Sequence, residues 1–183
     1  MCFSATASFV ASAVLTTSGA VCLSKAKKKE DVLLGSMPLI FGIQQFFEGL
    51  VWLFPANGLF TYIFAYVFLF FAFLWWPVYI PLTVWAHEQD ASRKCQLRPL
   101  IIFGGLGATY LLFILITHPL VVQIMEHSVR YDVQTWFYIP GVILYVIVTI
   151  GSILLSTTIF IRWFGVLALF SAWIAWEFYE RAF

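Results

Sequence analysis

The chain has 183 residues, of which 62% are hydrophobic and only 10% are charged. Soluble domains are nearer to half apolar, so this composition excludes an ordinary soluble fold. Apolar stretches of about twenty residues recur along the whole chain, and each is long enough to cross a hydrocarbon core of roughly 30 Å. No nucleic-acid partner is expected, because the one lysine-rich segment adjoins Glu30 and Asp31 and is flanked by two apolar stretches, which indicates a topology signal. The lipid bilayer is the expected partner.

The apolar segments predict an all-α, integral membrane bundle of six transmembrane helices, formed as a single domain over residues 1–183. The expected spans are about residues 3–24, 32–54, 59–86, 99–117, 136–155 and 159–179. The last two are separated only by Ser156-Thr157-Thr158, because the apolar stretch is too long for one crossing. Between the fourth and fifth spans, residues 118–134 predict a short amphipathic helix in the outer interface.

Basic residues predict how the bundle is oriented. They gather after the first span and before the fourth, at Lys25, Lys27, Lys28, Lys29, Arg93, Lys94 and Arg98. Loops rich in lysine and arginine stay on the cytoplasmic side, and two spans separate these loops, so the two assignments agree. We therefore expect both termini outside.

Small residues predict where helices cross closely. They occupy every fourth position of the first span, at Ser4, Ser8, Ser12, Thr16, Ala20 and Ser24, and in the second span they follow a heptad, at Gly35, Gly42 and Gly49. Such faces let helix backbones approach in lipid, where packing drives association. Gly104, Gly105 and Gly107 predict a similar patch in the fourth span. Pro77 and Pro81 predict a kink near the inner end of the third.

Two glutamates inside apolar segments are the strongest functional signal. Glu48 lies in the second span and Glu177 in the sixth. A charged group near the centre of a bilayer costs roughly 2.5–3.5 kcal/mol on insertion scales, so an ionisable residue there is a candidate functional site. Gln44 lies one helical turn before Glu48, and Gln45 borders the same face. We expect these residues to form an outward-facing polar pocket that handles an ion, a proton or a small solute.

Two further interpretations stay open. The carboxylates could bind a metal ion together with His118, His127 and Cys2, and an open coordination position would then support an intramembrane metal enzyme. Alternatively they are structural, in a non-catalytic subunit that packs against a partner membrane subunit or a second copy. No metal-binding spacing, phosphate loop or serine-hydrolase motif is present, so the sequence favours a role other than catalysis and singles out no catalytic residue.

Two short segments resemble a known family. Residues 1–9 read MCFSATASF and residues 41–49 read FGIQQFFEG. This pair is similar to an uncharacterised family of small bacterial multi-pass membrane proteins, a domain of unknown function. The resemblance implies a protein of the bacterial inner membrane and no activity. It makes the motif residues the ones to test, namely Cys2, Ser4, Ser8, Gln44, Gln45 and Glu48.

Overall fold

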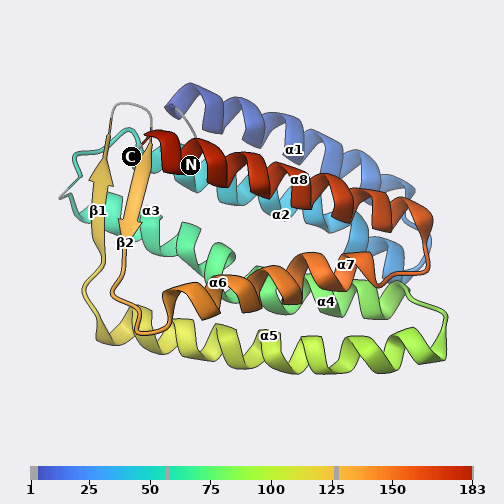
Figure 1. The fold of residues 1–183 in the computed structure, drawn as a ribbon. Helices are drawn as coiled ribbons and strands as arrows, with labels where there is room; N and C mark the ends of the chain where they lie inside the picture. The colour runs from blue at the N-terminus through green and yellow to red at the C-terminus, as the bar shows by residue number, and fades with distance from the viewer. Residues whose placement is uncertain (1–3, 57, 126–127, 183) are drawn as a thin grey trace. The chain divides into compact units, whose positions relative to one another are not determined.

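A computed structural model describes residues 4–56, 58–125 and 128–182, with side chains described as far as residue 174 (Figure 1). The α-helices are α1 (Ala5–Lys25), α2 (Lys29–Val51), α3 (Leu59–Leu69), α4 (Trp76–His87), α5 (Ala91–Thr117), α6 (Tyr138–Val146), α7 (Ser152–Leu154) and α8 (Ile159–Ala182). Two π-helices, η1 (Phe70–Trp75) and η2 (Ile147–Gly151), join α3 to α4 and α6 to α7, and two short strands are β1 (Val121–Ile124) and β2 (Val129–Asp132). The all-α fold class is confirmed.

Three helical stretches are long and apolar enough to cross a membrane: Ala5–Lys25, Leu59–His87 and Ala91–Thr117. Shorter apolar helices cover Tyr138–Leu154 and Ile159–Ile174. Helix α2 is also long, but the same glutamines and glutamate that mark the candidate site make it less apolar. These features support a membrane location, and crossings by all six stretches stay a prediction.

The chain divides into two compact units. Unit 1 contains the described parts of residues 1–75 and 108–136, and unit 2 contains those of residues 76–107 and 137–183. Each unit has its own close helix crossing, described in turn below.

In unit 1, α1 and α2 meet along the predicted small-residue faces. Ser4 caps α1, because its hydroxyl accepts a hydrogen bond from the Ala7 N–H at 3.2 Å. Further along α1, Ser12 donates its hydroxyl to the Gly42 carbonyl oxygen at 2.7 Å. A Cβ atom on Gly42 would lie only 2.8 Å from the Thr16 backbone nitrogen, so this crossing requires glycine. The predicted packing seam is therefore confirmed at Ser8, Ser12 and Thr16, whereas Ala20 and Ser24 are exposed and Gly19 makes the close contact at that end.

The expected interfacial helix over residues 118–134 is wrong, because this segment forms a β-hairpin. Strands β1 and β2 are antiparallel, with Val122 opposite Tyr131 and Ile124 opposite Val129. Their inward side chains join Val51, Ala65 and Leu69 in the core of unit 1, and Tyr131 stacks on Phe68. β-branched valines fit the pleated surface of a sheet. The spacing of the apolar residues in this segment is compatible with a helix as well as with paired strands, so the sequence pattern alone does not distinguish them.

In unit 2, a proline carbonyl forms the closest helix contact. Pro81 has no N–H, so the Pro77 carbonyl oxygen four residues earlier loses its usual helical donor. Gly104 of α5 packs directly on this carbonyl: a Cβ atom there would lie 2.9 Å from the Pro77 carbonyl carbon. Gly105 and Gly107 meet open space instead, so only Gly104 of the predicted glycine patch makes a close contact. The predicted hinge at residues 156–158 is confirmed, since α7 ends at Leu154 and α8 begins at Ile159.

Candidate functional site

Glu48 lies in the last turn of α2 and is buried inside unit 1. Only 1% of the residue is exposed, and Gln44, one turn earlier on the same face, is 6% exposed. Gly42 and Gly49 occupy the neighbouring face that crosses α1, which leaves the Glu48 face toward the rest of the unit. Gln45 is half-buried at its edge. The Glu48 side chain therefore points into protein and not into lipid.

Beyond Glu48, α2 enters the apolar core of unit 1. Val51, one turn further along, is fully buried. It packs with side chains from α3, the end of α5 and the hairpin, namely Ala65, Leu69, Leu115, Leu120, Val122 and Val129. The polar atoms of a buried carboxyl group need hydrogen-bond partners, because burying them unpaired costs free energy. Glu48 therefore lies at the border between the polar face of α2 and the apolar core of unit 1.

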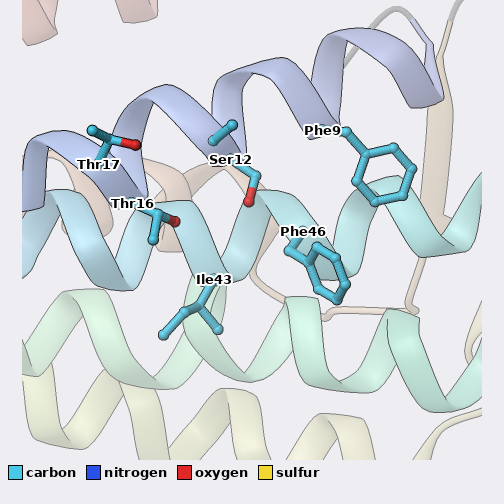
Figure 2. Close-up of a pocket in the computed structure, with 7 residues that line it drawn as sticks. Phe9, Ser12, Thr16, Thr17, Ile43 and Phe46 are labelled. Carbon is cyan, nitrogen blue, oxygen red and sulfur yellow. The ribbon is translucent and has the colours of Figure 1, made fainter. Parts of the chain in front are cut away.

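Two hollows in the surface of unit 1 lie along α1. The first has a volume of about 520 Å³ and is lined by Phe9, Ser12, Thr16 and further residues of α1 together with Ile43 and Phe46 of α2 (Figure 2). The second continues along α1 from Ala13 to Cys22. Their linings are mainly apolar and include neither Glu48 nor Gln44. They are grooves of an apolar helix surface, and they do not form the predicted polar pocket.

The predicted metal ligands are not brought together among the described residues. His118 follows α5, where its Nδ1 lies 2.9 Å from the Thr117 hydroxyl and its ring meets Trp136 edge-on. Within the described part of the chain, no three of His, Cys, Asp and Glu lie close enough to hold a metal ion. Cys2, His127 and the side chain of Glu177 lie outside the described residues.

A second buried carboxylate, Glu88, was not singled out by the sequence analysis. It follows α4 directly and is 1% exposed. Its Oε1 accepts hydrogen bonds from the Gln89 N–H at 2.8 Å, the Asp90 N–H at 3.0 Å and the Thr157 hydroxyl at 2.5 Å. Its Oε2 accepts one from the Thr157 N–H at 2.7 Å. Glu88 thus fastens the α4–α5 loop to the α7–α8 turn, 69 residues away.

These hydrogen bonds fix the charge state of Glu88. Burial raises the pKa of the carboxyl, but the donors of Thr157, Asp90 and Gln89 stabilise the anion more strongly and lower the pKa from 4.5 to about 2. Glu88 is therefore ionised at physiological pH and fully hydrogen-bonded. In the sequence, Glu88 is an acidic residue that follows an apolar helix and precedes Asp90, which accepts a hydrogen bond from the Arg93 N–H at the start of α5. Acidic residues in this position are equally typical of a solvated loop.

Comparison with known proteins places the chain in a family. The family model DUF6629, a family of unknown function, matches residues 1–183. The protein therefore belongs to this family, which confirms the resemblance to an uncharacterised family drawn from residues 1–9 and 41–49. No curated protein and no solved structure matches the chain.

Proposed function

We propose that the protein is a membrane protein that handles a proton, a small cation or another small solute through a polar site built around Glu48. The observation that supports this proposal is the burial of Glu48 to 1% exposure within a helical unit, on a face shared with the buried amide of Gln44. Intramembrane carboxylates in protein interiors are typical of ion pathways and proton relays.

The division of roles follows from side-chain chemistry. Glu48 is the residue that exchanges a proton or contacts the cation, because a carboxylate offers several acceptor sites. Gln44 and Gln45 supply amide groups beside Glu48. Each amide can donate a hydrogen bond to the carboxylate or accept one from the protonated carboxyl group, and it does not titrate itself. The seam between α1 and α2 is tightly packed by Ser12 and Gly42, so it holds α2 in place while the neighbouring face stays polar.

The test is flux through purified protein in proteoliposomes, measured with a pH-sensitive dye under proton, sodium and potassium gradients. We expect wild-type protein to carry flux above that of empty liposomes and Glu48→Gln to abolish it. Glu30→Gln is the matched control, because it makes the same change in the first turn of the same helix. Flux that is the same in Glu48→Gln and wild type, or absent from wild type under every gradient, would contradict the proposal.

A subunit role is the alternative, and the surface of α8 favours it. Large apolar side chains cover this helix, with Phe160 82% exposed and Leu167 62% exposed. Lipid satisfies such a surface, and so does a partner helix. Co-purification of a fixed membrane partner, or of a second copy, at constant stoichiometry in mild detergent would support the subunit role. A monomer that carries flux alone would exclude it.

A further inference from the structure

The last two turns of α4 contain buried polar atoms with no hydrogen-bond partner among the described residues. They are the hydroxyl oxygen of Thr83, the indole nitrogen of Trp85 and Nδ1 of His87. Thr83 is 0% exposed, so its hydroxyl has no access to bulk solvent. An unsatisfied buried hydroxyl costs free energy, and a native fold rarely leaves one in that state.

Thr83 and His87 share one face of α4. Residues four apart in a helix lie one above the other, with about 5–6 Å between their Cβ atoms. That separation suits one small molecule that hydrogen-bonds to both side chains, because two hydrogen bonds of about 2.8 Å each span a similar length. We therefore treat the Thr83 hydroxyl oxygen and His87 Nδ1 as parts of one site.

A further buried hydroxyl group lies on the helix that packs against α4. Ser152 of α7 is fully buried, and α7 contacts α4. Its hydroxyl donates to the Thr149 carbonyl oxygen at 2.7 Å, so Ser152 is satisfied within its own helix, in contrast to Thr83.

We propose that Thr83 and His87 form a binding site for an internal water molecule, supplied from the end of unit 2 at which Glu88 lies. Water can donate to one side chain and accept from the other, whichever tautomer His87 adopts. This site is in unit 2 and does not depend on the role of Glu48 in unit 1.

The sign of one stability change tests the site. Thr83→Val keeps the shape of the side chain and removes the hydroxyl. If water satisfies Thr83, the variant loses those hydrogen bonds, and we expect the thermal unfolding midpoint to fall by about 2–4 °C. If nothing satisfies it, removing the hydroxyl raises the midpoint or leaves it unchanged, and either result would overturn the proposal. Thr61→Val calibrates the assay, because the buried Thr61 hydroxyl donates to the Pro55 carbonyl at 2.8 Å and its loss must lower the midpoint.

A second measurement asks directly whether water reaches Thr83. Thr83→Cys and Val84→Cys are made in a background where the cysteines at 2, 22 and 95 are serine, and each is treated in nanodiscs with hydroxyethyl methanethiosulfonate, a small neutral water-soluble thiol reagent. Val84 is the matched control, since it is 1% exposed on the adjacent position. We expect faster modification of the thiol at position 83, read as a mass increase. Equal rates at the two positions would overturn the proposal.

Discussion

Two glutamates of this chain are equally buried but differ in what surrounds them. Glu48 and Glu88 are each 1% exposed. Glu88 receives four hydrogen bonds from N–H and O–H groups and lies just outside the apolar helices, so it is a stable anion with a structural task. Glu48 lies in the last turn of α2, on a helix face that leads into the apolar core of unit 1. Burial alone therefore does not identify a functional carboxylate.

Replacing Glu88 by glutamine should destabilise unit 2. The glutamine amide keeps one acceptor oxygen, but its NH₂ group replaces the second carboxylate oxygen. That NH₂ group cannot accept hydrogen bonds from donors such as the Thr157 N–H. We expect a loss of about 2–3 kcal/mol in the free energy of unfolding, the size of one or two hydrogen bonds to a charged group. Denaturant titration in detergent measures it. Asp132→Asn is the matched control, because its exposed pair with Arg130 should contribute less than about 1 kcal/mol.

The same variant predicts a pH dependence. The pKa of Glu88 is lowered from 4.5 to about 2 in the folded protein, so the anion stabilises the fold above pH 4.5. This contribution is lost as the pH falls toward 2, where the folded protein also binds the proton. The stability difference between wild type and Glu88→Gln should therefore shrink between pH 4.5 and 2. A stability difference that stays constant over that range would show that the Glu88 anion does not stabilise the contact with Thr157.

Sequence reasoning found one of these carboxylates and missed the other for a physical reason. Glu48 is surrounded by apolar residues in the sequence itself, so its cost in a membrane could be predicted from local composition. Glu88 lies in a polar loop, and its main partner, Thr157, is 69 residues away. Only the packing of α4 beside α7 brings the two loops together, and no local pattern encodes that contact.

At the scale of elements, proline and glycine act as a pair in unit 2. Pro81 removes the helical donor of the Pro77 carbonyl, and Gly104 brings its Cα–H group against that oxygen. A weak Cα–H···O contact is one way to satisfy a carbonyl where no water is available. The π-helices η1 and η2 lie close to this crossing in the sequence, which fits a region where regular i to i−4 hydrogen bonding is interrupted.

Gly104→Ala and Gly107→Ala should change stability in opposite directions. The added methyl group at position 104 would collide with the Pro77 carbonyl, and backbone cannot move aside cheaply, so we expect a loss of about 1–3 kcal/mol. At position 107 a methyl group meets open space and improves helix propensity by about 0.5–1 kcal/mol. Thermal unfolding of the two variants beside wild type measures both. Equal effects at the two sites would contradict the close crossing.

The helices were predictable from the sequence because each apolar segment is long and bounded by charged or turn-forming residues. The hairpin was not, because its valines fit two periods. Val121, Met125 and Val129 recur at helical spacing, while the buried Val122 and Val129 face the core from paired strands. Packing against the core of unit 1 selects the strands over the helix. That packing involves residues far apart in the sequence, so a short stretch of sequence does not reveal it.

At the scale of the whole chain, the hydrogen bonds between Glu88 and Thr157 constrain the membrane topology. They join the loop before α5 to the turn before α8, so these two connections lie at the same end of unit 2. The basic residues predict that this end is cytoplasmic, because Arg93, Lys94 and Arg98 follow Glu88 directly. Because Glu88 links the two connections, the same prediction extends to the turn before α8.

Thiol labelling of sealed right-side-out vesicles tests this orientation. Cys95 is exposed in the first turns of α5, so as the sole cysteine it should react with a membrane-impermeant maleimide only after the vesicles are permeabilised. Gln134→Cys, placed at an exposed position after the hairpin in a chain without other cysteines, should react without permeabilisation. The two thiols are opposite controls for each other, since both are accessible to solvent. Labelling of Cys95 from outside would reverse the topology. Glu48 would then lie nearer the cytoplasmic face, and under the proposed function a solute would reach it from within the cell.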